Sequence, residues 1–199
     1  MNLEELATLL LGLAYVLLAL RGQRWCWPVG AASAALLGWL SWASNLPLQA
    51  GLQLFYIVLA VQGWRHWSAS PGVLAVERWS LRRQGPGLVL AVAGAAALVP
   101  LQQQVLPPGS QSAWPWLDAL TTSFSLWATW LAARAVLENW LYWVVINVVI
   151  TGLYLAQGLP WLALLFVLYA VLAVEGWRRW RRLLAPLESA AAAPGTGAT

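Results

Sequence analysis

Polar side chains set within long apolar segments give this sequence the chemistry to bind a small molecule. Gln49, Gln53 and Tyr56 recur at helical spacing in one such segment, so they fall on one face of a helix. Similar stripes are formed by Asp118, Thr122, Ser125 and Thr129, and by Trp143, Asn147 and Tyr154, while Tyr169 occupies a later segment. Buried polar groups are costly in an apolar setting, so we expect these stripes to line a wet cavity.

The side chains in these stripes indicate what the cavity binds. Amides supply donors and acceptors, and aromatic faces stack on rings and attract cations. A neutral or singly cationic molecule with an aromatic ring and hydroxyls fits both properties. The candidate substrate-binding residues are Gln49, Gln53, Tyr56, Thr122, Trp143, Asn147 and Tyr169. For Ser125 and Thr129, bonding within the helices is the alternative to lining the cavity.

A five-residue phrase occurs twice, as GWRHW at 63–67 and as GWRRW at 176–180, each near the end of an apolar segment. Tryptophan at a span end is commonly an interfacial anchor, and we apply that interpretation to Trp25, Trp27, Trp79, Trp114, Trp116 and Trp161. Trp67, however, continues the stripe of Gln53 and Tyr56. We therefore expect an inner gate formed or flanked by Trp64, Trp67, Trp177 and Trp180, with anchoring as the alternative.

Several kinds of chemistry lack the residues they need. The single cysteine, Cys26, and the single histidine, His66, build neither an internal disulfide nor a metal cluster. No nucleophile–base pair, phosphate loop or nucleotide-binding motif occurs. The sequence thus predicts no enzyme, no catalytic residues, no metal or cofactor, and no coupling to ATP.

Composition places the chain in a membrane, because 61% of its 199 residues are hydrophobic and only 9% are charged. Soluble domains have about 45–50% apolar and about 25% charged residues. A span needs about 20 apolar residues, and seven segments approach this: 3–20, 28–45, 46–64, 87–106, 116–133, 140–157 and 159–177. Pro47 and Pro160, each preceded by polar or glycine residues, separate adjoining segments.

The arginines predict how the seven helices are oriented. There are eleven arginines and no lysine, and threading seven spans with the N-terminus outside puts all eleven on one side. Positive residues stay in the cytoplasm, so we expect an outer N-terminus and a cytoplasmic C-terminus. The basic charge is then a property of membrane topology, and no nucleic-acid partner is implied.

An internal repeat organises the chain. A shift of 113 residues superimposes 21–67 on 134–180 without a gap, with 17 identities in 47 positions. The repeat predicts an all-α membrane protein of seven helices in a three-plus-one-plus-three parallel arrangement, like that of SWEET carriers. The expected parts are a first three-helix repeat at 1–67, a cytoplasmic loop and linking helix at 68–113, a second three-helix repeat at 114–180, and a basic end with a disordered tail at 181–199.

Longer phrases resemble the PnuC family of vitamin transporters. They are the run at 46–67 (LPLQAGLQLFYIVLAVQGWRHW), Asp-Ala-Leu-Thr-Thr at 118–122, and Glu-Asn-Trp-Leu-x-Trp at 138–143 followed by Asn147. The resemblance implies facilitated diffusion of nicotinamide riboside, an NAD precursor, into the cytoplasm, where a kinase traps it by phosphorylation. Thiamine or riboflavin is the alternative substrate. A SWEET-type sugar carrier and a non-transporting scaffold are further alternatives.

The expected partners follow from this interpretation. They are the vitamin, the lipid bilayer, a functionally linked cytoplasmic kinase and, in a homo-oligomer, further copies of the chain. The expected location is the cytoplasmic (inner) membrane of a bacterium, crossed several times.

Overall fold

The computed structural model describes residues 3–44, 47–69, 74–106 and 114–192. Over these residues the chain is helical, with one helix in each predicted segment. The helices are α1 (Leu3–Ala19), α2 (Cys26–Ala43), α3 (Pro47–Ser68), α4 (Leu81–Val105), α5 (Pro115–Ala133), α6 (Asn139–Ala156) and α7 (Pro160–Ala192). Among the described residues, three stretches are long and apolar enough to cross a membrane: Leu81–Val105, Asn139–Ala156 and Pro160–Leu184.

The two proline breaks predicted from the sequence are confirmed. α2 ends at Ala43 before α3 begins at Pro47, and α6 ends at Ala156 before α7 begins at Pro160. Proline suits the first helical position, because the N–H that it lacks has no partner there. Asn45, part of the first predicted break, lies outside the described residues.

Two helices extend further than predicted. α4 begins at Leu81 instead of 87, since the Ser80 side chain accepts a hydrogen bond from Arg83 N at 3.4 Å and caps the helix. α7 continues to Ala192, so the part of the predicted tail up to that residue is helical. The alanines, leucines and glutamate of that stretch are good helix formers.

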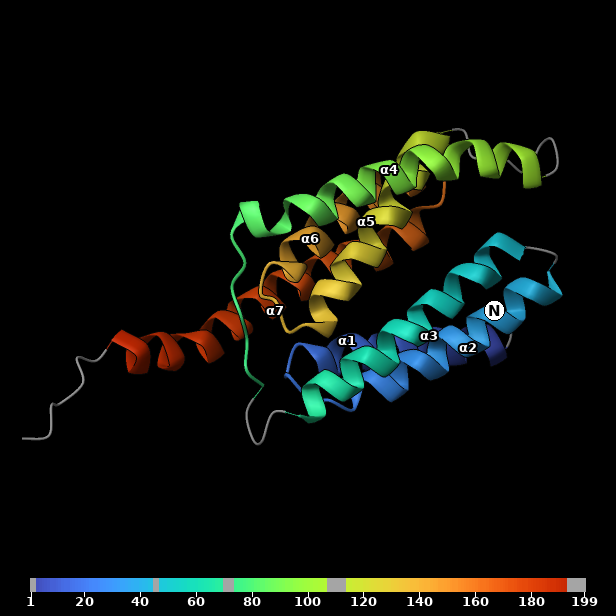
Figure 1. The fold of residues 1–199 in the computed structure, drawn as a ribbon. Coiled ribbons are helices and arrows are strands. Elements are labelled where there is room, and N and C mark those ends of the chain that lie inside the picture. The colour runs from blue at the N-terminus through green and yellow to red at the C-terminus, as the bar shows by residue number, and fades with distance from the viewer. Residues whose placement is uncertain (1–2, 45–46, 70–73, 107–113, 193–199) are drawn as a thin grey trace, which may run out of the picture.

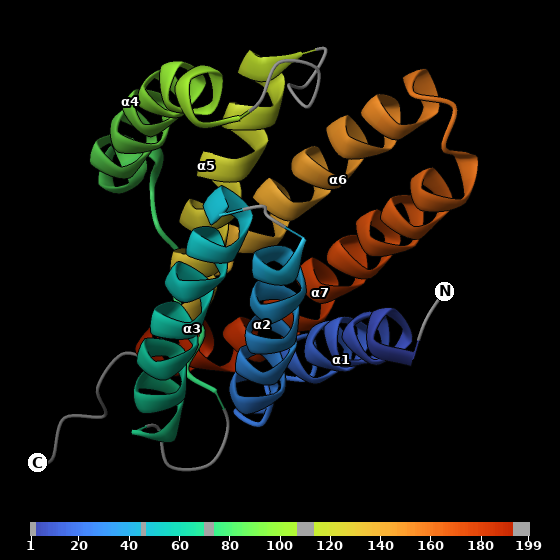
Figure 2. The same ribbon diagram turned by 90° about the vertical axis from the view of Figure 1, so that its right-hand side faces the viewer.

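The helices form two groups (Figures 1 and 2). In the first group α2 packs against α1 and α3, and in the second α6 packs against α5 and α7 while α4 covers α5. Between the groups α3 lies along α5, whereas α1 and α7 meet over a shorter stretch. The seam between the groups is therefore where both halves of the chain contribute residues.

An extended segment, residues 74–80, connects the two groups at one end and is called the strap below. Leu74 and Val76 of the strap are buried in the same apolar cluster as Trp67 and Trp180. Glu77 pairs with the turn between α5 and α6, donating from its N to Ala135 O at 3.0 Å and accepting from Leu137 N at 2.8 Å.

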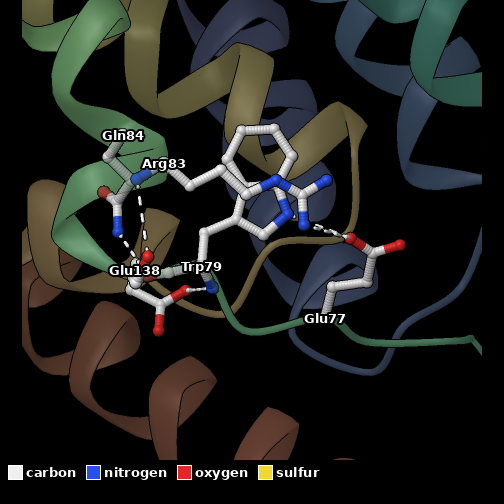
Figure 3. A network of polar contacts seen from close by, with 6 residues as sticks. Glu77, Trp79, Arg83, Gln84 and Glu138 are labelled. Atoms are coloured by element: carbon white, nitrogen blue, oxygen red, sulfur yellow. Dashed lines mark hydrogen bonds and ion pairs between the residues drawn. The ribbon is translucent and has the colours of Figure 1, made fainter.

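Polar contacts fasten the strap to α4 and α6 (Figure 3). The backbone N of Trp79 donates to Glu138 Oε2 at 3.0 Å, and Gln84 Nε2 donates to Trp79 O at 2.7 Å. The Arg83 guanidinium lies 3.8 Å from the centre of the Trp79 ring and pairs with Glu77 at 3.6 Å. The start of α4 is therefore tied to the second group of helices.

Candidate substrate-binding site

A cavity of about 210 Å³ lies at the seam between the two groups and is called the first chamber. Its walls come from α1, α6 and α7 and include Asn147, Trp143, Phe166 and Tyr169. At one end it is bounded by tryptophans from four helices, Trp27, Trp67, Trp140 and Trp180. The chamber is thus lined mainly by aromatic rings, with asparagine side chains among them.

A second chamber of about 160 Å³ adjoins the first, on the side of α2, α3 and α5. Gly12, Tyr15, Trp27 and Trp143 line both chambers. The second chamber adds the polar side chains Gln53, Tyr56, Ser33 and Thr129. The two chambers together offer one site with an aromatic part and a more polar part.

Two buried amides are the main groups for recognition. Asn147 is 5% exposed in the first chamber and Gln53 is 7% exposed in the second. Among the described residues, neither chamber is lined by an acidic or basic side chain. A ligand therefore meets hydrogen-bonding groups and aromatic faces, with no full charge to neutralise its own.

Five of the seven residues predicted to bind substrate line the chambers: Gln53, Tyr56, Trp143, Asn147 and Tyr169. The other two, Gln49 and Thr122, line neither, and Gln49 is exposed. The hydroxyls of Ser125 and Thr129 donate to carbonyls of their own helix at 2.7 and 2.8 Å. Both hydroxyls thus bond within their own helix, but Thr129 also lines the second chamber, whereas Ser125 lines neither chamber.

The four predicted gate tryptophans divide into two pairs. Trp67 and Trp180 are buried and line the first chamber, whereas Trp64 and Trp177 line neither chamber. The centre of the Trp64 ring lies 5.2 Å from the centre of the Trp25 ring and 5.3 Å from the Arg24 guanidinium carbon, towards the surface. Only one tryptophan of each doubled phrase therefore reaches the cavity.

Two tryptophans interpreted as anchors are placed differently by the structure. Trp27 is 2% exposed within the bundle and lines both chambers, and Trp79 is buried beneath the Arg83 side chain. The anchoring interpretation is wrong for both, because their neighbours are helices and the strap. Position near the end of a span does not tell whether a tryptophan ring faces inward or outward. The one signal available was the repeat: Trp140, the counterpart of Trp27, lies one turn from Trp143 in the polar stripe of α6.

Four tryptophan rings form a continuous row at the end of the first chamber. Successive ring centres lie 5.3 Å apart for Trp27–Trp67, 5.6 Å for Trp67–Trp180 and 5.4 Å for Trp180–Trp140, all edge to face. Edge-to-face contacts between aromatic rings are favourable. The row packs in the same apolar cluster as Leu74 and Val76 of the strap.

Two crossed hydrogen bonds join the helix groups at this row. The indole N–H of Trp67 on α3 donates to the Ala132 carbonyl of α5 at 3.1 Å. The indole N–H of Trp180 on α7 donates to the Ala19 carbonyl of α1 at 3.1 Å. Each half thus bonds to the other through an equivalent pair, since both the donors and the acceptors are 113 residues apart.

Two glycines allow the row to pack closely. A Cβ built at Gly63 would overlap the Trp27 ring, and one built at Gly176 would overlap the Trp140 ring. The glycine of each doubled phrase therefore receives the flat face of a tryptophan from a neighbouring helix.

A neutral, aromatic chamber between two groups of largely apolar helices defines the class of protein, a helical membrane carrier of small organic molecules. The chain belongs to the nicotinamide mononucleotide transporter family, whose model matches residues 2–182. This result confirms the resemblance to PnuC transporters found in the sequence.

Individual relatives carry different vitamins. The riboflavin/roseoflavin transporter RibM of Streptomyces davaonensis is 28% identical over 176 residues, which cover 86% of this chain and 81% of that protein. The nicotinamide riboside transporter PnuC of Escherichia coli is 26% identical over 175 residues, covering 76% and 73%. A crystal structure of the vitamin B3 transporter PnuC shares the fold, with a TM-score of 0.70 and 21% identity over 90% of this chain and 81% of that one.

Proposed function

We propose that this protein carries nicotinamide riboside across the bacterial inner membrane by facilitated diffusion. The observation that carries the proposal is the first chamber, in which Asn147 faces a cavity bounded by Trp143, Phe166 and Tyr169. Nicotinamide riboside has a positively charged pyridinium ring, a carboxamide and ribose hydroxyls. Aromatic faces attract a cation by about 0.5–2 kcal/mol per contact, so such a ring needs no carboxylate here.

The two chambers suggest how the molecule lies. The nicotinamide ring occupies the first chamber, where the Asn147 amide meets its carboxamide with both donor and acceptor. The ribose reaches the second chamber, where Gln53, Tyr56 and Thr129 supply groups for its hydroxyls. In this arrangement Gln49 and Thr122 do not contact the vitamin.

The duplicated sequence and paired contacts support a parallel repeat with an outer N-terminus. The turns after α1 and α5 each hold a residue at positive φ, Gly22 at 67° and Ala135 at 55°, and these positions are 113 residues apart. The crossed bonds of Trp67 and Trp180 repeat with the same interval. With the arginines cytoplasmic, the tryptophan row lies at the inner end of the pathway and acts as the inner gate.

Uptake into liposomes tests this function directly. Purified protein reconstituted without nucleotides is expected to equilibrate labelled nicotinamide riboside across the membrane, with unlabelled compound competing. Protein-free liposomes control for leakage. A scaffold gives no substrate-dependent flux, and this outcome contradicts the proposal.

Riboflavin is the second candidate, because a riboflavin transporter is similar over most of this chain. Its ring system is neutral, which suits chambers without charged walls among the described residues. Competition by riboflavin and thiamine in the same assay decides among the three vitamins. Stronger competition by riboflavin than by nicotinamide riboside would replace the first candidate with the second.

A further inference from the structure

Tyr15 occupies the junction between the two chambers. It projects from α1, one turn from Gly12, and both residues line the first and the second chamber. The other two residues shared by the chambers, Trp27 and Trp143, come from α2 and α6. A molecule that extends from one chamber to the other therefore passes the Tyr15 ring.

Neighbouring helices hold the Tyr15 ring in this place. A Cβ built at Gly30 of α2 would lie 2.8 Å from Tyr15 Cδ2 and 3.2 Å from Cε2, so the ring already lies against the α2 backbone. The Trp27 ring meets it edge to face, with centres 5.9 Å apart. The ring therefore cannot withdraw towards α2.

Each chamber alone is smaller than a typical ligand site, so the junction between the chambers matters for binding. Sites for drug-sized ligands have volumes of about 300–1,000 Å³. At about 210 and about 160 Å³, neither chamber alone reaches that range, whereas the two joined do. A ligand of this size must therefore occupy both chambers and pass Tyr15, one of the four residues that line both.

Comparison of the two repeats shows that a tyrosine at this place occurs only in the first half of the chain. The counterpart of Tyr15 is Ala128, which is fully buried, and the counterpart of Gly30 is Trp143. The first half thus pairs a large residue on its first helix with a small one on its second, and the second half does the reverse. Asn147 lines only the first chamber and Gln53 only the second, whereas Tyr15 lines both.

We propose that Tyr15 determines substrate size, admitting a single aromatic ring with a sugar and rejecting a fused, multi-ring system. The proposal rests on the proposed vitamin transport and names the residue that selects among vitamins. A single ring is contained by the first chamber while the sugar passes Tyr15. A three-ring flavin extends beyond the first chamber and meets the phenol ring.

The test measures binding of nicotinamide riboside and riboflavin to Tyr15→Ala and Tyr15→Leu in detergent, by calorimetry. The wild type is expected to prefer nicotinamide riboside. We expect the affinity ratio to move towards riboflavin by about tenfold or more in both variants, which corresponds to about 1.4 kcal/mol. Tyr15→Phe retains the ring and is expected not to shift the ratio towards riboflavin.

Controls separate this proposal from the function on which it rests. Leu10→Ala, a change at a side chain that is 55% exposed on the same helix, is expected to keep both affinities. Equal changes for the two vitamins in the Tyr15 variants overturn the size limit and leave vitamin transport standing, as does equal wild-type affinity for both. A wild type that binds neither vitamin overturns both proposals. If neither Tyr15→Ala nor Tyr15→Leu elutes as folded protein, Tyr15 is a structural residue and the size limit is wrong.

Discussion

At the scale of single residues, the site depends on amides that have no charged neighbour in their chambers. Gln53 and Gln49 both belong to α3, about one turn apart, but only Gln53 faces a chamber. An amide facing the chamber can bond to the ligand, whereas an exposed one has no contact with it. Gln49 and Gln53 therefore show that a residue can belong to the polar stripe of a helix without lining a chamber.

Asn147→Ala and Gln53→Ala are each expected to weaken vitamin binding by about three- to tenfold, since a neutral hydrogen bond contributes about 0.5–1.5 kcal/mol. Gln49→Ala is the matched control and is expected to leave affinity unchanged. Calorimetry on folded, purified variants gives the three values. Wild-type affinity in both Asn147→Ala and Gln53→Ala would remove these amides from the site.

The crossed indole bonds make a second prediction at this scale. Trp67→Phe or Trp180→Phe keeps an aromatic ring but removes the indole hydrogen bond to the Ala132 or Ala19 carbonyl, which then keeps only the backbone N–H of Ala135 or Gly22. Because a neutral hydrogen bond contributes about 0.5–1.5 kcal/mol, we expect the proposed inner gate to open more often. The measure is the rate at which a thiol reagent labels Ala173→Cys, a substitution at a residue that lines the first chamber.

The two single variants should speed labelling by similar factors, as equivalent positions of a repeat. Trp64→Phe, which changes a tryptophan outside the chambers, serves as the control and should not alter the rate. Unchanged labelling in the Trp67 and Trp180 variants would mean that these tryptophans anchor the helices and do not gate the pathway.

At the scale of helices, close packing between α2 and α3, and between α6 and α7, sets the position of the tryptophan row. Gly63 and Gly176 allow Trp27 and Trp140 to lie against neighbouring helix backbones. The strap then covers this end, with Leu74 and Val76 packed in the cluster that contains Trp67 and Trp180. Helix contacts thus hold the rings of the tryptophan row in place.

Gly63→Ala and Gly176→Ala are therefore expected to destabilise the protein by about 1–3 kcal/mol, the usual cost of overpacking. Gly51→Ala on α3 and Gly152→Ala on α6 are matched controls, because no neighbouring atom lies within 4 Å of a Cβ built there. Alanine favours a helix over glycine, so the controls should be neutral or slightly more stable. Thermal melting in detergent ranks the stabilities of the four variants. Equal melting temperatures for all four would contradict close packing at Gly63 and Gly176.

How far the fold follows from sequence differs between its elements. Pro47 and Pro160 separate the helices correctly because proline acts through its own backbone, which is a local property. The start of α4 at Leu81 was missed because Arg82, Arg83 and Gln84 are polar. What holds Arg83 and Gln84 is their contact with Trp79 of the strap, whose backbone N–H donates to Glu138. That contact joins distant parts of the chain and leaves no periodic pattern.

Some residues of the candidate site could also be found from local sequence pattern, and others could not. Helical spacing placed Gln53 and Asn147 on inward faces, since a stripe records which side of a helix is polar. Tyr15 and Trp27 gave no such signal, because aromatic rings suit a lipid-facing surface as well as an interior. Their place at the junction depends on how α1 and α2 meet, and only the packed structure shows it.

At the scale of the whole molecule, the two helix groups meet around the chambers and are joined by the crossed bonds and the strap. Among the described residues, those that line the chambers and the tryptophan row include no acid and no histidine, and the walls near the row are mainly tryptophan and alanine, with Asn139. Intramembrane acids and histidines are the usual relays for protons. The proposed facilitated diffusion moves no ion alongside the vitamin, and imposed gradients test this.

Because nicotinamide riboside is a cation, a membrane potential would itself drive its distribution, so the potential is held at zero in this assay. Transport is then expected to stop when the vitamin reaches equal concentrations inside and outside the liposome. Imposing a proton or sodium gradient should leave both the initial rate and the final level unchanged within about twofold, since a coupled ion would otherwise add free energy that grows with the logarithm of its concentration ratio. Liposomes that enclose a vitamin kinase with ATP and Mg²⁺ should instead accumulate the phosphorylated vitamin, because removal of the free form maintains the inward gradient. Liposomes with kinase but no ATP are the control. At zero membrane potential, accumulation of unmodified vitamin above the external concentration under an ion gradient would show coupled transport and overturn facilitated diffusion.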